Sequence, residues 1–339
     1  MKLALTGLPT CGKTTLFSAL TQRKMSAGGR ETSDLALLPV PDERVDKLSA
    51  MYNPKKTTYA QVTFQDPPAP LFKADDPTTK LPPELRQADG LVEVVRNFDG
   101  GFGAPKPAQD HHSLLEEMIL NDLITLERRI ERIEGEKKRG REIDKEELAL
   151  CQQALALVEA ETPLRSQPEL AGHHKLRGFG LLSAKPLLVV ANNADEDPES
   201  PTLGTDEEVL VVRASIEAEL ADLPEDERGE FMADLGLTGS TLDRLIAASY
   251  RALNLISFFT VGEDEVRAWT VAAGSTAPVA AGVIHSDLQK GFIRAEIMSY
   301  HDLMEHRSEQ ALKKAGLFKV VGKDHVVSDG EILHVRFNV

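Results

Sequence analysis

One eight-residue segment near the start of the chain restricts its possible folds more than any other. It fits the pattern G-x-x-x-x-G-K-[ST] and reads Gly7-Leu8-Pro9-Thr10-Cys11-Gly12-Lys13-Thr14. The short apolar stretch before it, residues 2–6, predicts a buried strand, and the helical spacing of apolar residues within 14–25 predicts a helix after it. Strand, glycine-bounded loop and helix is the order that a phosphate-binding loop requires. A chance match in an ordinary strand–turn–helix is the alternative.

This order predicts how the loop would bind a nucleotide. Glycines let the backbone curl so that successive N–H groups form an anion nest, and the following helix adds its positive N-terminal end. We expect Lys13 to reach the β- and γ-phosphates and the Thr14 hydroxyl to ligate Mg²⁺. The residues of this loop that we expect to contact the nucleotide are Leu8, Pro9, Thr10, Cys11, Gly12, Lys13, Thr14 and Thr15. Cys11 lies near the predicted helix N-terminus, which would lower its thiol pKa and make it sensitive to oxidants; a small side chain that only fills space is the alternative.

Two further residues are candidate Mg²⁺ ligands. Thr32 lies in a polar loop after the first predicted helix, where P-loop switch proteins carry a metal-binding Thr, and Ser33 is a second candidate there. Asp66 ends a predicted strand, at the position where P-loop proteins hold Mg²⁺ through water. The alternative for Asp66 is a strand terminator before a turn. The predicted catalytic residues are Lys13, Thr14 and Asp66.

The sequence after Asp66 differs from that of a switch GTPase. Such proteins continue Asp-x-x-Gly, whose glycine N–H binds the γ-phosphate, whereas this chain continues Asp66-Pro67-Pro68-Ala69-Pro70. Proline has no N–H to donate, and alanine is less flexible than glycine. We therefore expect altered γ-phosphate sensing, which leaves two functions open: slow hydrolysis, or nucleotide binding with little or no hydrolysis.

A second motif predicts contacts to the nucleotide base. The apolar residues 186–191 predict a buried strand, which ends at Asn192-Asn193-Ala194-Asp195. Guanine-binding proteins carry Asn-Lys-x-Asp here, whose Asn fastens the loop and whose Asp accepts two hydrogen bonds from guanine. Asn193 replaces the Lys, so the preference between adenine and guanine stays open, and an Asx-rich turn is the alternative. Ala214 and Ser215 follow another predicted strand, residues 209–212, where a base-contacting loop is expected.

A helical pattern interrupts the predicted sheet. Apolar residues recur at spacings of three and four over residues 113–133 and 143–160, which predicts an antiparallel helical hairpin. The expected tip carries the densest basic cluster of a chain whose formal net charge is −15. The cluster is either a solvated hairpin end or a contact to RNA or an acidic protein. Its residues are Lys137, Lys138, Arg139 and Arg141.

Composition limits where the protein works. The two cysteines, Cys11 and Cys151, are too few for a disulfide framework. No apolar run approaches the roughly 20 residues of a membrane span. The predicted strand at residues 2–6 leaves no room for a signal peptide. We therefore expect a cytoplasmic protein with no membrane partner.

The chain resembles the YchF family, the Obg-like ATPases, over essentially all 339 residues. The similarity is most specific in its C-terminal part, which resembles the TGS domain of that family. The segments that carry it are 7–21, Pro39-Val40-Pro41-Asp42, Glu230-Phe231-Met232, Leu235-Gly236-Leu237, 250–255, Glu265-Val266-Arg267-Ala268-Trp269-Thr270, Gly274-Ser275-Thr276-Ala277-Pro278, Ala281-Gly282-x-Ile284-His285-x-Asp287, Lys290-Gly291-Phe292-Ile293-Arg294-Ala295-Glu296 and Phe337-Asn338-Val339.

The resemblance implies three parts. These are an α/β P-loop G domain from residues 1–112 and 183–255, an inserted helical hairpin from 113–182, and a C-terminal α+β β-grasp (TGS) domain from 256–339. It also implies slow nucleotide hydrolysis and association with the ribosome. We expect the nucleotide to be ATP or GTP with Mg²⁺, the protein to be a monomer, and the hairpin tip and the TGS domain to contact the ribosome. The family prefers ATP and ends its base motif in Glu, where this chain has Asp195. A small-molecule kinase is a weaker alternative, because no Arg-rich lid segment follows the phosphate loop.

Overall fold

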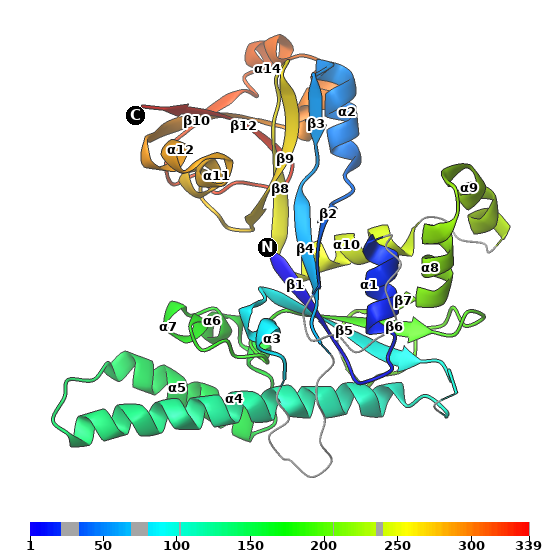
Figure 1. Ribbon diagram of the computed structural model, residues 1–339. Helices are drawn as coiled ribbons and strands as arrows, with labels where there is room; N and C mark the ends of the chain where they lie inside the picture. The colour runs from blue at the N-terminus through cyan, green and yellow to red at the C-terminus, as the bar shows by residue number, and fades with distance from the viewer. Residues whose placement is uncertain (22–33, 69–80, 102, 206, 235–239, 339) are drawn as a thin grey trace. The chain divides into compact units, whose positions relative to one another are not determined.

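The computed structural model describes residues 1–339 except 22–33, 69–80, 102, 206, 235–239 and 339 (Figure 1). The chain divides into two compact units, each built from two separate stretches of sequence. The first contains Met1–Ala36 and Thr63–Leu242, and the second contains Leu37–Val62 and Asp243–Val339. Among the described residues, no helix is both long and apolar enough to cross a lipid bilayer.

A six-stranded sheet with the order β2-β4-β1-β5-β6-β7 forms the centre of the first unit. Its strands are β1 (Lys2–Thr6), β2 (Asp34–Pro39), β4 (Gln61–Asp66), β5 (Gly90–Asn97), β6 (Leu187–Asn193) and β7 (Val209–Val212). β4, β1, β5, β6 and β7 pair in parallel. Helices cover both faces of such a sheet, so its strands are continuous apolar runs. The carboxyl ends of these strands meet at one edge, which brings the loops after β1, β4, β6 and β7 together.

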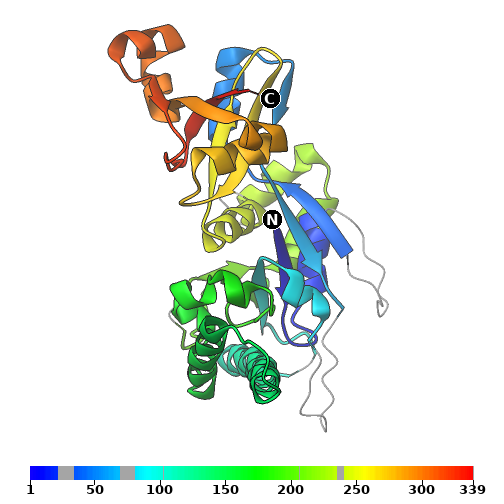
Figure 2. The same ribbon diagram turned by 90° about the vertical axis from the view of Figure 1, so that its left-hand side faces the viewer.

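Helices pack on both faces of this sheet (Figures 1 and 2). α3 and α4 cover β1 and β5 through Leu85, Leu114 and Met118. α1 and α8 pack against each other on the opposite face (Figure 1). The helices of this unit are α1 (Lys13–Thr21), α3 (Pro83–Gln87), α4 (Pro107–Lys138), α5 (Lys145–Glu159), a 3₁₀ turn (Leu164–Ser166), α6 (Pro168–Ala171), α7 (His174–Arg177), α8 (Ala214–Asp222) and α9 (Glu225–Asp234). A further helix, α10 (Thr241–Ala252), begins in this unit and continues into the second.

The hairpin of α4 and α5 has a core of its own. Leu126 on α4 packs with Cys151 and Val158 on α5, together with apolar residues of the 3₁₀ turn, α6 and α7. Asp144 caps α5 by accepting hydrogen bonds from the N–H groups of the first helical turn. Asp122 on α4 is fully buried and accepts hydrogen bonds of 2.7 Å from the backbone N–H groups of Leu182 and Ser183. This carboxylate fastens the chain where it returns from the hairpin to the sheet.

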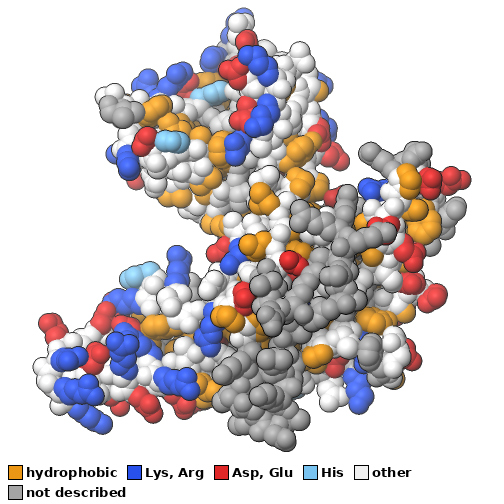
Figure 3. Space-filling model, in the orientation of Figure 1, with side chains coloured by type: hydrophobic (Ala, Val, Ile, Leu, Met, Phe, Trp, Pro, Cys, Tyr) orange, Lys and Arg blue, Asp and Glu red, His pale blue; other side chains and the backbone are white. Residues whose placement is uncertain are grey.

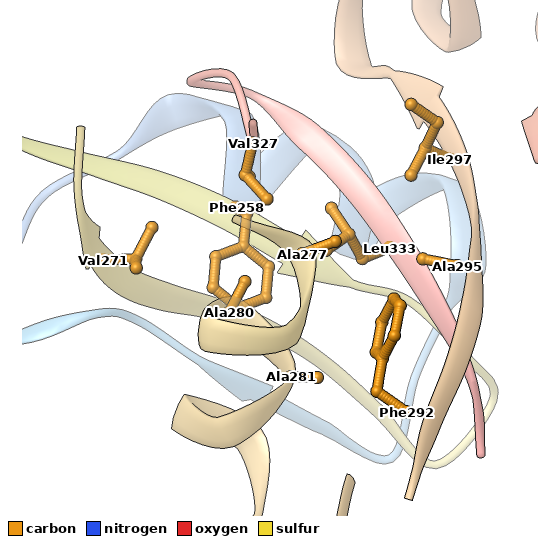
Figure 4. Packing of buried hydrophobic residues seen from close by; sticks show 10 residues of the cluster. All are labelled: Phe258, Val271, Ala277, Ala280, Ala281, Phe292, Ala295, Ile297, Val327 and Leu333. Atoms are coloured by element: carbon orange, nitrogen blue, oxygen red, sulfur yellow. The ribbon is translucent and has the colours of Figure 1, made fainter. Parts of the chain in front are cut away.

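The second unit contains another six-stranded sheet, with the order β11-β10-β12-β8-β9-β3. α11 packs on it through Ala277, Ala280 and Ala281, whose small side chains let the helix approach Phe258 and Phe292 closely (Figure 4). The elements are α2 (Glu43–Tyr52), β3 (Lys56–Thr58), β8 (Leu255–Thr260), β9 (Glu265–Ala272), α11 (Ala277–Ile284), α12 (Ser286–Lys290), β10 (Phe292–Ser299), α13 (Tyr300–His306), α14 (Glu309–Ala315), β11 (Lys319–Val321) and β12 (Glu331–Phe337).

Residues 37–62 lie in this second unit, whereas the sequence placed them in the nucleotide-binding domain. β3 pairs in parallel with β9, with Thr57 opposite Val266. Arg44 on α2 forms an ion pair of 2.6 Å with Asp329. These partners lie more than 200 residues further along the chain, so no local pattern reveals the pairing.

Two helical features of this unit have local causes. In α11, alanines and one N-terminal proline form a helix without an amphipathic pattern. α13 and α14 are two separate helices. They separate at Arg307, whose φ of 60° lies in the left-handed region.

Candidate functional site

The phosphate loop joins β1 to α1 at the carboxyl edge of the first sheet. Gly7 and Gly12 have positive φ angles, 147° and 89°. A Cβ at Gly7 would overlap the carbonyl oxygen of Val94, and one at Gly12 would overlap the side-chain amide of Asn192. Glycine is therefore required twice, because β5 and β6 approach the loop closely.

Lys13, Thr14 and Asp66 lie together, as a phosphate and metal site requires. Lys13 Nζ lies 2.7 Å from Asp66 Oδ1, and it also donates to the carbonyl oxygen of Pro67. The Thr14 hydroxyl donates to Asp66 Oδ2 at 3.2 Å. The side chains of Lys13 and Asp66 are 9% and 4% exposed, so the ion pair is shielded from solvent. Asp66 therefore contacts both groups that a bound nucleotide and its metal would use.

The donor set here fits Mg²⁺. The ion prefers hard oxygen ligands, and a hydroxyl beside a carboxylate provides them. Among the described residues, Asp66 Oδ1 has no hydrogen-bond partner beyond its ion pair with the Lys13 ammonium. The other predicted ligand, Thr32, and its neighbour Ser33 lie outside the described residues.

Asn192 connects the phosphate loop to α8. It is the penultimate residue of β6 and is buried. Its Nδ2 donates to the carbonyl oxygen of Cys11 at 3.1 Å, and its Oδ1 accepts from the N–H of Ala214 at 3.0 Å. One amide thus fixes the two loops that would hold the phosphates and the base.

A pocket of about 410 Å³ opens beside this amide. Asp195 and Ser215 both line it, and the Ser215 hydroxyl donates to Asp195 Oδ1. The full lining is Gly12, Thr15, Phe98, Asp99, Gly100, Asn192, Asn193, Ala194, Asp195, Glu196, Ala214 and Ser215. The pocket thus brings together most residues that the sequence predicted to contact the base. The aromatic wall at Phe98 and the residues after it were missed, because a Gly/Pro-rich loop carries no binding motif.

Asn193 has a structural contact inside this loop. Its Nδ2 donates to the carbonyl oxygens of Asp197 and Glu199, at 3.0 and 2.6 Å, and its Oδ1 accepts from Asn97. Because the side chain is buried and bonded in this way, it holds the turn after β6. Asn193 also lines the pocket, so its contact with a nucleotide stays a prediction.

The expectation that Cys11 has a lowered pKa is wrong. Burial raises the pKa of this thiol to about 12. The side chain is 3% exposed, so the cost of removing a thiolate from water exceeds the effect of nearby donors. Cys11 therefore fills space behind the loop in its neutral form.

A buried pair of a glutamate and a histidine behind the loop was not predicted. Glu93 on β5 and His111 on α4 lie 2.8 Å apart, and both side chains are almost fully buried. Burial raises the pKa of Glu93. Burial lowers the pKa of His111, but the contact with Glu93 outweighs this and raises it overall. The pair joins the root of the hairpin to the strand beneath the phosphate loop, and no sequence motif indicates that the two residues meet.

The basic residues at the hairpin tip lie where α4 ends and the turn to α5 begins. Lys137, Lys138, Arg139 and Arg141 are all exposed. Figure 3 shows Lys and Arg side chains gathered at this end of the hairpin. The surface is therefore open to an acidic partner.

The fold and this site place the chain in the class of P-loop nucleotide-binding proteins. A family model described as YchF-GTPase_C, protein of unknown function (DUF933), matches residues 255–338. The chain is 37% identical over 363 residues to the "Ribosome-binding ATPase YchF" of Haemophilus ducreyi, covering all of this chain and 99% of that protein. It is also 37% identical over 365 residues to the Bacillus subtilis protein of that name, with 98% of each covered.

Two less similar relatives also match nearly the whole chain. The "Obg-like ATPase 1" of Oryza sativa subsp. japonica is 31% identical over 366 residues, covering all of this chain and 92% of that protein. The solved structure of the Schizosaccharomyces pombe YchF GTPase has a TM-score of 0.81 and 30% sequence identity, covering 99% of this chain and 97% of that one. The chain belongs to the YchF family.

Proposed function

We propose that this protein binds and slowly hydrolyses ATP or GTP, with Mg²⁺, as a switch that works on the ribosome in the cytoplasm. The observation that carries the proposal is the buried cluster of Lys13, Thr14 and Asp66 at the phosphate loop. The names of its relatives, which include "Ribosome-binding ATPase", support both the reaction and the partner.

The residues of the site suggest how hydrolysis would be promoted. Lys13 would neutralise charge on the β- and γ-phosphates, and the N–H groups of the loop would bind their oxygens. Thr14 and Asp66 would hold Mg²⁺, which supplies further positive charge to the phosphates when bound. Asn192 would keep the loop in place through its bond to Cys11.

Replacing Lys13 tests this assignment. The Lys13→Ala variant should lose measurable nucleotide binding and multiple-turnover phosphate release. Lys145→Ala removes an exposed lysine at the start of α5 and should change neither. Unchanged nucleotide affinity in Lys13→Ala would show that the phosphate loop is not the binding site.

Nucleotide binding without turnover is the second candidate. Pro67 and Pro68 have no N–H to offer a γ-phosphate, and the carbonyl oxygen of Pro67 accepts from Lys13. In that case the bound nucleotide would stabilise the form of the protein that binds its partner. Phosphate release that Lys13→Ala abolishes would exclude this candidate, whereas tight binding with no release would support it.

We further propose that the hairpin tip contacts ribosomal RNA. Its four exposed cations can neutralise phosphates, which makes binding depend on salt. Replacing Lys137 and Lys138 with alanine should reduce co-sedimentation with ribosomes and lower the salt slope, by about 0.7–0.9 for each lost phosphate contact. A control variant with Lys106→Ala and Arg177→Ala loses the same charge from two exposed positions of the first unit, at the start of α4 and the end of α7. Equal binding by the tip variant and the wild type would place the contact elsewhere.

A further inference from the structure

The two helices of the hairpin are paired along only part of their length. α4 has 32 residues and α5 has 15, so at the rise of an α-helix they are about 48 Å and about 22 Å long. Figure 1 shows α4 extending well beyond α5. Val158, in the last turn of α5, packs in the same cluster as Ile119 of α4. The part of α4 before Ile119 therefore lies beyond the end of α5.

An apolar groove of about 700 Å³ opens where α5 ends. Leu115, Ile119 and Leu123 of α4 line it and recur every fourth residue, so they form one stripe along the helix. Leu120 lines it too and is 39% exposed, which leaves apolar surface open to a partner. Leu8 also lines the groove and brings it to the phosphate loop. Such a groove can receive the apolar face of another helix.

The rim of this groove is acidic. Four glutamates line it, Glu116, Glu117, Glu159 and Glu161, and no lysine or arginine is among its described lining residues. The histidine among them, His112, lies 3.1 Å from Glu116. The hairpin tip is basic, so the two ends of the hairpin differ in sign. The rim would repel a nucleic acid and attract the cationic side chains of a protein.

We propose that this groove docks a basic, amphipathic helix of a partner protein. The apolar face of that helix would pack on the stripe of α4, and its lysines or arginines would face the glutamates. It would take the place beside α4 that a longer α5 would occupy, and it would contact the phosphate loop at Leu8. Residues 69–80, which lie outside the described residues, carry two lysines and two aspartates and offer no net charge to the rim. The inference does not depend on the proposed nucleotide chemistry.

Fluorescence anisotropy with the full-length protein tests this proposal. The probe is a fluorescent peptide of leucine and lysine with about 14 residues, or about four helical turns, and its leucines recur at helical spacing. Leu120→Lys should weaken its binding at least about 10-fold, because the variant loses an apolar contact and places a cation beside a basic helix. Val320→Lys is the matched control. It makes a similar change on β11, at an apolar residue that is 60% exposed and outside the groove, and should bind like the wild type.

Reversing the charge of the rim tests its chemistry. Glu116→Lys combined with Glu159→Lys should lose the leucine–lysine peptide and gain a leucine–glutamate peptide of the same pattern, which the wild type should not bind. This gain would itself show that the variant is folded. Glu127→Lys combined with Glu131→Lys makes the same change in charge at exposed positions of α4 outside the groove and should keep the wild-type preference.

Other outcomes would overturn the proposal. No binding by the wild type, or equal binding by Leu120→Lys and Val320→Lys, would show that the groove does not dock such a helix. Binding gained only with Leu71→Ser and Phe72→Ser would show that the chain's own residues fill it. Self-association in sedimentation that Leu120→Lys abolishes would assign the groove to a second copy of the chain. Nucleotide binding that depends on Lys13 is measured separately, so none of these results bears on the proposed function.

Discussion

Replacing Asp66 with asparagine tests whether this carboxylate and a nucleotide phosphate compete for Lys13. The two side chains form an ion pair of 2.7 Å and are less than 10% exposed. Removing one partner of a buried pair costs about 3–5 kcal/mol, because the other charge is left without compensation. The nucleotide-free Asp66→Asn variant should therefore lose about 3 kcal/mol of unfolding free energy, the low end of this range, since an amide oxygen still faces Lys13.

The same pair should lower nucleotide affinity in the wild type when Mg²⁺ is absent. A phosphate must then displace Asp66 from Lys13 and lie beside a second negative charge. The variant avoids both costs, and recovering only 1.4 kcal/mol would raise its affinity about 10-fold. With Mg²⁺ present, the wild type should bind nucleotide more tightly than the variant, because its carboxylate can then help to hold the metal.

Calorimetric titration in EDTA and in excess Mg²⁺ measures both affinities, and urea denaturation measures stability. Asp264→Asn is the matched control. Its carboxylate also lies 2.7 Å from a lysine, Lys55, but both side chains are more than 80% exposed, so its loss should have no measurable effect. The competition argument fails if Asp66→Asn binds nucleotide no more tightly than wild type in EDTA.

Two other substitutions have clear expectations. Asn192→Ala leaves the carbonyl of Cys11 and the N–H of Ala214 without partners. Urea denaturation should therefore show that the free energy of unfolding falls by about 2–4 kcal/mol, and nucleotide binding should be weaker. A fall below about 1 kcal/mol would contradict this. Burial raises the pKa of Asp122 to about 6 from an ordinary 3.8. Between these two pKa values the native state therefore holds more protons than the unfolded state. Asp122 then contributes up to about 3 kcal/mol to the free energy of unfolding at low pH, and this contribution is lost as pH rises from 4 to 6. The difference in unfolding free energy between wild type and Asp122→Asn should fall across that window, and a constant difference would refute the assignment.

Local chemistry explains which parts of the site could be predicted from the sequence. The phosphate loop follows from glycine spacing and from the periodicity of its neighbours, and the structure brings Lys13, Thr14 and Asp66 together as expected. The strand at 209–212 and the two hairpin helices follow from apolar patterns, although α4 begins six residues before its predicted start. Its first turns are polar, so periodicity does not mark them.

Contacts between distant residues could not be predicted in this way. The pairing of β3 with β9 depends on packing of the finished sheet, and Glu93 meets His111 only after α4 crosses β5. The Cys11 thiol shows the same limit: its neighbours in sequence suggest a lowered pKa, and its burial in the fold raises it. The inward position of Asn193 likewise depends on a turn that no motif describes.

The division of residues 37–62 from the rest of their unit has a consequence for synthesis. β3 is translated about 200 residues before β9, and a translating ribosome adds roughly 5–20 residues per second. The early segment therefore waits about 10–40 seconds for its partner strand. During that interval the apolar side of α2, with Val45 and Leu48, has none of the later strands to cover it. A fragment cut at residue 256 would lack the same edge strand, so a C-terminal unit prepared for biophysical work must include both stretches of the chain.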